Sequence, residues 1–405
     1  MSGRFTPLVL GFLAVSSVAA CGGNESSTSA SEAPSTPETS QVAITEAPTT
    51  TVDPASLASL YTEAGPYPVG VTTLQLESGN QVEVWYPAVA GTTGTESYDV
   101  RDFVPEAIRA LLTADVPAKY DYTAGRDAMV ADGTFPVVLF SHGYSGIRLQ
   151  STFLTAHLAS WGMVVAAPDH WSRDLNHVLS APVGDRESAV DELLASLDLL
   201  TDGNSDPGSL FDGHIDDTRV IALGHSAGGG TIVGAAADDR VDGYISMASG
   251  VVGMGGSTAT TTAPPTFVNK PSFFIAGSLD AVVPAETVTR VSFDAVPSPS
   301  RLWIVDGVGH NGFDDFCTFG NGSGIIGVAL ASGLAPLLDA QPTLKSLGQD
   351  GCIPPAQPVE MGFPIIKHAV TAQLRNWFGD DARPLGLDAS VADQYELAVV
   401  IEAKP

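Results

Sequence analysis

The sequence predicts an α/β domain with a mostly parallel central sheet and helices on both faces. Short runs of wholly apolar residues recur along the chain and alternate with segments of helical periodicity. Strands that are apolar at every position are typical of a sheet buried on both sides, which requires helical crossovers between the strands. No internal repeat accompanies this alternation. We therefore expect one large domain over residues 57–405.

The domain is expected to begin with an antiparallel hairpin. Residues 71–76 and 81–86 are its predicted strands, because the Gly79-Asn80 pair between them favours a turn. Residues 91–134 are mixed, with a predicted helix over residues 105–113. Further strands are predicted over residues 136–140, 163–167, 219–223, 244–248, 273–276 and 302–305, with an edge strand over 398–401. Helices are predicted over residues 148–160, 186–200, 227–237 and 365–378.

The N-terminal region carries the pattern of an export signal. Residues 5–20 form an apolar run after Arg4, shorter than the roughly 20 apolar residues of a membrane-spanning helix. We interpret residues 1–20 as a secretory signal peptide. The run ends in Val18-Ala19-Ala20-Cys21 and resembles a bacterial lipoprotein signal, which implies lipidation of Cys21. An ordinary cleaved signal peptide is the alternative.

Residues 21–56 are expected to be a flexible tether. Ser, Thr and Pro fill 17 of the 33 positions from 22 to 54, and too few apolar groups remain to offset the entropy of ordering. A lipid on Cys21 would hold the domain at a membrane, so we expect an exported protein of the cell envelope or the extracellular space. A plain linker without an anchoring role is the alternative.

The charge balance excludes nucleic acid as a partner. The chain carries 18 Lys and Arg residues against 46 Asp and Glu residues, a net charge of −28. Binding to phosphate backbones depends on basic side chains that displace counterions, and this chain has few of them.

The three cysteines fit an exported protein. With Cys21 lipidated, Cys317 and Cys352 are left as a pair in a compartment where disulfides persist. We expect them to be bridged, which would stabilise the domain by about 2–4 kcal/mol, and to hold residues 321–361 as a packed excursion. The cysteine and histidine spacings match no zinc motif, so we expect no metal.

The strongest chemical signal is Gly224-His225-Ser226-Ala227-Gly228. It follows the predicted strand 219–223 and precedes the predicted helix 227–237. In this context Gly-x-Ser-x-Gly forms a strained turn that exposes the serine hydroxyl, and larger residues two positions away would collide with the backbone. We predict that Ser226 is a nucleophile; a merely tight strand-to-helix turn is the alternative.

A serine nucleophile needs a base to take its proton and an acid to orient that base. The turn around Ser226 predicts the chain order serine, acid, histidine. Asp280 follows one predicted strand and His310 follows the next, so we predict Asp280 as the acid and His310 as the base. Three other carboxylates compete for the role of acid and would otherwise be solvated loop residues: Asp306, Asp314 and Asp315.

Two backbone N–H groups are needed to hold the oxyanion of an acyl-transfer reaction. We assign one to Ala227, the residue after the nucleophile, and the other to Tyr144, in the glycine-containing loop after strand 136–140. Tyr144 as an aromatic residue flanking the core is the alternative. We expect His142 and His225 to be hydrogen-bonded structural residues.

Four phrases of the sequence resemble one branch of the α/β-hydrolases. They are Phe140-Ser141-His142-Gly143, Ala167-Pro168-Asp169-His170, the run Gly224–Gly229 and the run Gly309–Cys317. They are similar to bacterial dienelactone-hydrolase-like proteins and plasma-type platelet-activating-factor acetylhydrolases, and also to cutinase-like polyesterases. The resemblance covers residues 69–378 and implies an α/β-hydrolase fold and carboxyl-ester hydrolysis without a cofactor. True dienelactone hydrolases use a cysteine nucleophile, so Ser226 argues against that activity.

Together these features predict a membrane-tethered serine hydrolase that cleaves carboxylic esters of short to medium acyl chain. Its substrate would be a small-molecule ester, a lipid or a polyester, and we expect a monomer. No long amphipathic lid is evident, which predicts an open site, although residues 91–134 and 249–269 could cover it. The enzymatic alternatives are platelet-activating-factor-type acyl hydrolysis and polyester hydrolysis. The alternative from another class is a surface lipoprotein that uses the scaffold for binding.

Overall fold

The computed structural model describes residues 53–180, 188–251 and 267–405. The expected signal peptide, Cys21 and nearly all of the expected tether lie outside the described residues. Most of the segment 249–269 also lies outside them.

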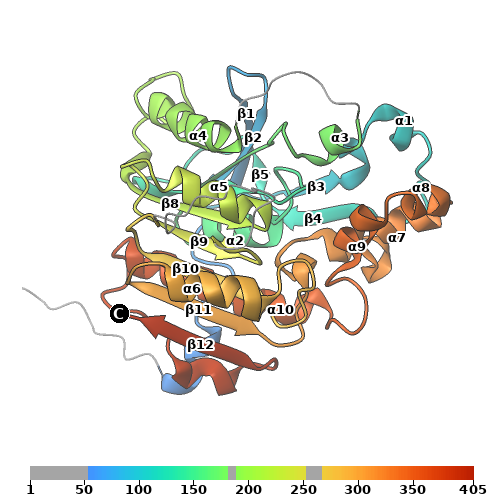
Figure 1. Ribbon diagram of the computed structural model, residues 1–405. Helices are drawn as coiled ribbons and strands as arrows, with labels where there is room; N and C mark the ends of the chain where they lie inside the picture. Colours follow the sequence, from blue (N-terminus) through green and yellow to red (C-terminus); the bar gives the residue numbers. More distant parts are fainter. Residues whose placement is uncertain (1–52, 181–187, 252–266) are drawn as a thin grey trace, which may run out of the picture. The chain divides into compact units, whose positions relative to one another are not determined.

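One large sheet forms the centre of the domain (Figure 1). Its strands are β1 (Val69–Gln75), β2 (Gln81–Pro87), β5 (Gly125–Arg126), β6 (Phe135–Ser141), β7 (Val164–Pro168), β8 (Ile215–His225), β9 (Gly243–Met247), β10 (Ser272–Gly277), β11 (Ser300–Val305) and β12 (Val399–Lys404). Their order across the sheet is β12-β11-β10-β9-β8-β6-β7-β2-β1-β5. The strands from β6 to β11 are parallel, whereas β2 is antiparallel to both β1 and β7, and β12 is antiparallel to β11. The predicted hairpin, parallel centre and C-terminal edge strand are confirmed.

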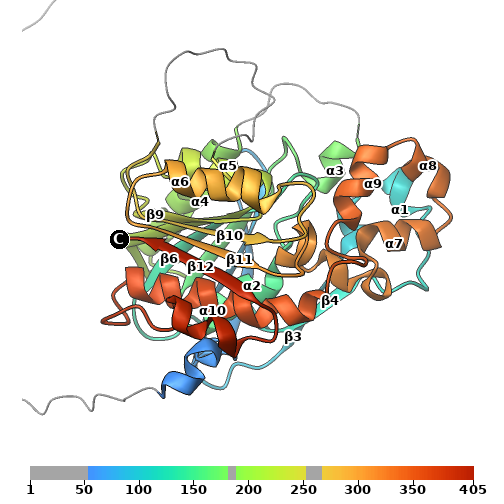
Figure 2. The same cartoon turned by 60° about the horizontal axis from the view of Figure 1, so that its bottom comes forward.

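Helices cover both faces of this sheet. The α-helices of the described residues are α1 (Glu106–Arg109), α2 (Thr152–Ser160), α3 (Leu175–Val178), α4 (Ala189–Asn204), α5 (Ala227–Ala235), α6 (Arg290–Ala295), α7 (Gly324–Ala331), α8 (Ala335–Asp339), α9 (Pro342–Gln349) and α10 (Val359–Trp377). Figure 2 shows α2 and α10 on one face and α4, α5 and α6 on the other.

The core is divided between the two faces because successive residues of a strand point in opposite directions. On β6, Val138 and Phe140 belong to the apolar cluster that includes residues of α2 and α10. Val137 and Leu139 belong to the cluster that includes residues of α4, α5 and α6. Every residue of β6 is buried, as the continuous apolar run predicted.

Several boundaries differ from the prediction. Helix α2 begins at Thr152 rather than at residue 148, and α1 has four residues, none of them buried, so packing supports only a short turn there. Helix α10 begins at Val359 and runs through Pro364, although a proline usually ends or kinks a helix.

The segment between the two cysteines is folded into helices α7, α8 and α9. In both views they lie at the same end of the domain as α1 (Figures 1 and 2). The mixed segment nearby contains a small antiparallel sheet of β3 (Thr95–Asp99) and β4 (Lys119–Thr123). The structure contains the expected Cys317–Cys352 disulfide. Within the described part of the chain, every helix falls short of the length and apolar character needed to cross a membrane.

Candidate active site

Ser226 occupies a strained turn between β8 and α5. Its backbone has φ 54° and ψ −120°, in a region that residues other than glycine rarely adopt. The glycines around it permit the turn, because a Cβ on Gly224 would lie 2.4 Å from the carbonyl oxygen of Gly228, and a Cβ on Gly228 would lie 2.0 Å from that of Ser141. The small residues at 224 and 228 therefore allow this tight turn, from which the side chain of Ser226 projects beyond the end of β8 and the start of α5.

The structure brings Ser226, His310 and Asp280 together in one hydrogen-bonded chain. The Nε2 atom of His310 lies 2.8 Å from Ser226 Oγ, and its Nδ1 atom lies 2.9 Å from Asp280 Oδ2. The three residues are 7%, 1% and 4% exposed, respectively. With the ring proton on Nδ1, His310 donates to the carboxylate and its Nε2 is free to accept the serine proton.

The three side chains follow the C-terminal ends of parallel strands β8, β10 and β11, where α/β sheets usually bind ligands. The Asp280 carboxylate is held from its other side. Its Oδ1 accepts hydrogen bonds from the amides of Val282 at 2.9 Å and Val283 at 2.6 Å. The loop backbone thus orients the carboxylate toward the ring of His310.

The loop after β6 lies directly against Ser226. A Cβ on Gly143 would lie 3.2 Å from the Cβ of Ser226, so only a small residue fits there. Among the hydrogen bonds of the described residues, none uses the amide of Tyr144 or of Ala227 as its donor. The Tyr144 side chain is 51% exposed and is therefore not a core aromatic. Both predicted oxyanion donors remain available to a ligand.

Buried polar groups hold this loop in place. Arg173 donates to the carbonyl oxygen of His142 through both Nε and Nη2, and Nη2 also donates to Ser141 Oγ at 2.7 Å. His142 lies 2.8 Å from the carbonyl oxygen of Gly143 through Nδ1, and its Nε2 accepts from the amide of His170. Burial, with a further contribution from Arg173, lowers the pKa of His142 to about 3, so the ring is neutral.

His225, next to the nucleophile, is also a structural residue. Its Nε2 lies 3.0 Å from the carbonyl oxygen of His310, and its Nδ1 lies 2.6 Å from Gln150 Nε2. Burial, and then the nearby ring of His310, hold the pKa of His225 well below its usual range. A neutral His225 therefore supports the backbone of the histidine loop, as expected from the sequence.

The three competing carboxylates have other partners. Asp306 is exposed and accepts from Ser278 Oγ at 2.7 Å. The expectation that Asp314 and Asp315 are solvated is wrong, because both are fully buried. Burial raises the pKa of both groups well above the usual range. Asp315 accepts the first amides of α2, at Thr152 and Phe153, which explains why that helix begins there.

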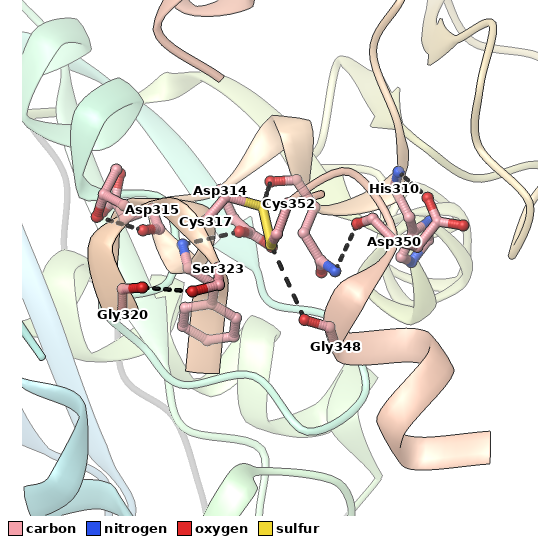
Figure 3. Close-up of a disulfide and its surroundings, with 12 residues drawn as sticks. His310, Asp314, Asp315, Cys317, Gly320, Ser323, Gly348, Asp350 and Cys352 are labelled. Carbon is pink, nitrogen blue, oxygen red and sulfur yellow. Dashed lines mark hydrogen bonds between the residues drawn. A yellow bond between two sulfur atoms is a disulfide. The ribbon is translucent and has the colours of Figure 1, made fainter. Parts of the chain in front are cut away.

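Asp350 connects the acid loop to the histidine loop, and the sequence analysis missed it. Its Oδ1 accepts from the amide of His310 at 2.7 Å, and its Oδ2 accepts from the amide of Ala281 at 3.0 Å. Figure 3 shows Asp350 beside His310, close to the disulfide. Its position two residues before Cys352 was the one available signal, because a bridge from Cys317 brings this segment to the histidine loop.

The described residues contain no group of three or more His, Cys, Asp or Glu side chains that could hold a metal ion.

A comparison with known protein families covers the part of the chain that contains this site. A family model described as PET hydrolase-like (PETase) matches residues 121–331, which include the loop after β6, Ser226, Asp280 and His310. The chain belongs to the PET hydrolase-like family. This membership and the sheet topology confirm the predicted α/β-hydrolase fold and the similarity to cutinase-like polyesterases. Asp350, Cys352 and helices α8 to α10 lie beyond the matched residues.

Curated relatives show the same similarity. Cutinase 2 of Thermobifida cellulosilytica is 28% identical over 188 residues, which cover 44% of this chain and 62% of that protein. Cutinase of Thermobifida fusca is 28% identical over 188 residues, 44% of this chain and 50% of that protein. A bis(hydroxyethyl) terephthalate hydrolase of Streptomyces coelicolor is 36% identical over 106 residues, 26% of this chain and 30% of that protein. The chain thus spans between about a third and 62% of the length of these relatives.

Proposed function

We propose that this protein is a serine hydrolase that cleaves carboxylic esters through an acyl-enzyme on Ser226. The observation that carries the proposal is the hydrogen-bonded chain from Ser226 through His310 to Asp280. The names of the similar proteins, cutinase and bis(hydroxyethyl) terephthalate hydrolase, support ester hydrolysis as the reaction.

In the proposed mechanism, His310 is the general base. Its Nε2 takes the proton of Ser226 as Oγ bonds to the ester carbonyl carbon, and the carbonyl electron pair moves onto oxygen. The amides of Tyr144 and Ala227 donate to that oxyanion, while Asp280 stabilises the imidazolium. The tetrahedral intermediate then expels the alcohol, which receives the proton from His310. Water attacks the acyl-enzyme by the same steps, which releases the acid and restores Ser226.

We further propose that residues 57–405 form the catalytic domain of an exported, monomeric lipoprotein without a cofactor. In this proposal residues 1–20 are removed as a signal peptide, Cys21 carries the lipid, and residues 21–56 tether the domain to the membrane. The Ser/Thr/Pro-rich composition of the tether and the disulfide support export. Globomycin treatment of the producing bacterium tests the anchor, because inhibition of lipoprotein signal cleavage should leave an uncleaved precursor only if Cys21 is processed as proposed.

Simple esters of short to medium acyl chain are the proposed substrates. A polyester is the second candidate, favoured by the names of the relatives. Platelet-activating-factor-type phospholipids remain a third, with no specific observation in their favour.

The test is an initial-rate series on p-nitrophenyl esters from acetyl to palmitoyl, with Ser226→Ala and the exposed-site control Ser56→Ala. We expect Ser226→Ala to lose about 10⁴- to 10⁶-fold in kcat and Ser56→Ala to match the wild type. Films of an aliphatic polyester and a phospholipid with a short sn-2 chain, assayed in parallel, separate the candidates. A wild type without activity on any ester would favour a binding role for the scaffold.

A further inference from the structure

An apolar cavity lies beside the loop that follows β6. It has a volume of about 110 Å³, whereas a single water needs only roughly 10–15 Å³ by the same measure. Its walls come from five segments that are distant in sequence: residues 100–112, 144–145, 175–179, 311–316 and 325–348. Figure 2 shows α1, α3 and α7 to α9 gathered at this end of the domain.

The cavity adjoins the candidate active site on two sides. Tyr144 and Ser145 line it, and they directly follow Gly143, which lies against Ser226. Asn311 also lines it and directly follows His310. The wall of the cavity is thus continuous with the two loops that flank the serine hydroxyl.

The chemistry of the wall selects an aliphatic ligand. Branched aliphatic side chains predominate, among them Ile108, Leu175, Leu334 and Leu344, and no Lys, Arg, His, Asp or Glu of the described residues lines the cavity. A charged group would lose its hydration there without meeting an opposite charge among the described lining residues, and the one buried hydroxyl of the wall without a hydrogen-bond partner is that of Ser145. The amide of Asn311 is already used, because its Nδ2 donates to the carbonyl oxygens of Leu347 and Asp350.

We propose that this cavity binds the aliphatic acyl chain of the ester substrate. The proposal rests on the proposed esterase function and adds its substrate class. Each methylene group that moves from water into such a cavity improves binding by up to about fourfold. We therefore expect kcat/KM to rise with acyl length until the cavity is full.

Part of the cavity wall lies outside the residues that the family model matches. Residues 100–112 lie before the matched range 121–331, and α8 and α9 lie after it. The substrates of the relatives therefore do not predict which acyl-chain length this cavity accepts. Variants of the lining residues of this chain are needed to measure it.

The test is to fill the cavity from α7. Ala329 lines it, whereas its neighbour Leu330 is 37% exposed and does not. We expect Ala329→Phe to lower kcat/KM on p-nitrophenyl octanoate by about 15-fold, the equivalent of two methylene groups, with p-nitrophenyl acetate unchanged within twofold. The matched control Leu330→Phe should leave both rates unchanged. Leu344→Ala should enlarge the cavity and move the optimum to longer acyl chains.

Three results would overturn the proposal. One is an equal effect of Ala329→Phe on acetate and octanoate, with the fold intact by circular dichroism. The second is an unchanged chain-length profile in both cavity variants. If Ala329→Phe does not fold, an unchanged optimum in Leu344→Ala is the third. In all of these the wild type still hydrolyses acetate, whereas a wild type inactive on every ester refutes the esterase function itself.

Discussion

Replacing Asp350 by asparagine tests whether the segment before Cys352 positions the active site. The Asp350 carboxylate accepts from the amide of His310 through one oxygen and from the amide of Ala281 through the other. Asparagine keeps the shape but has one acceptor oxygen and one NH₂ donor. Whichever way the side chain turns, one of the two backbone amides faces a donor and loses its partner.

The expected magnitude follows from those two contacts. A hydrogen bond to a charged acceptor contributes roughly 1.5–3 kcal/mol. If the whole loss falls on the transition state, kcat decreases by about 10- to 150-fold. Because Asp350 contacts the loops and not the substrate in this mechanism, KM should stay within about twofold of the wild type.

The assay is steady-state hydrolysis of p-nitrophenyl acetate, with thermal unfolding of each variant measured alongside. Asp339→Asn is the matched control, because Asp339 is an exposed carboxylate of the same excursion and pairs only with Lys345 among the described ion pairs. It should leave kcat and KM unchanged. A wild-type kcat in Asp350→Asn would refute the positioning role, and so would a rise in KM at constant kcat.

Three further predictions concern stability and local geometry. Burial, and then a nearby lysine, lower the pKa of His157 to about 3. Because the unfolded chain therefore binds the extra proton, the free energy of unfolding should fall as the pH drops from about 6.5 toward 3. Urea unfolding should show that this free energy decreases less between pH 7 and pH 5 in His157→Gln than in the wild type, and equal decreases would contradict the prediction. Reduction of Cys317–Cys352, which are separated by 35 residues, should cost up to about 4 kcal/mol in the loop-entropy model, and a urea midpoint unaffected by reductant would count against this. Gly228→Ala should lose most activity because its Cβ would lie 2.0 Å from a backbone oxygen. Gly230→Ala should retain activity because a Cβ there has no atom within 4 Å. Similar hydrolysis rates in the two variants would rule out the steric argument.

The central strands could be predicted because strands buried on both faces consist of consecutive apolar residues, and such runs are visible in the sequence. Strand β8 shows the limit of that signal. It begins at Ile215, several residues before the predicted start, and its first part contains polar residues that still pair with the start of β6 through backbone hydrogen bonds. Helix α10 shows another limit. Because a proline is unfavourable inside a helix, local propensity predicted a start after Pro364, whereas the helix begins at Val359.

The serine, acid and histidine could be placed because their order and their positions after strands follow from the fold. Supporting residues such as Arg173 and Asp350 have no comparable local motif. Their partners lie far away in sequence, at Ser141 and at the loops of Ala281 and His310. The expectation that Asp314 and Asp315 are solvated is wrong for the same reason, because the partners of Asp315, which are the first amides of α2 and the hydroxyl of Tyr98, are distant in sequence.

The residues proposed for the chemistry lie within the part of the chain that the family model matches, whereas Asp350 and part of the cavity wall lie outside it. Ser226, Asp280 and His310 lie within residues 121–331, together with the amides of Tyr144 and Ala227 that we propose as oxyanion donors. Asp350, Cys352 and much of the cavity wall lie outside that range. The same disulfide-linked excursion therefore contacts the histidine loop through Asp350 and encloses the cavity through α7 to α9. If both roles hold, reduction of the disulfide should lower kcat on p-nitrophenyl acetate and also weaken the preference for longer acyl chains. If the excursion only stabilises the fold, the folded, reduced protein should keep the kcat and the chain-length preference of the oxidised one.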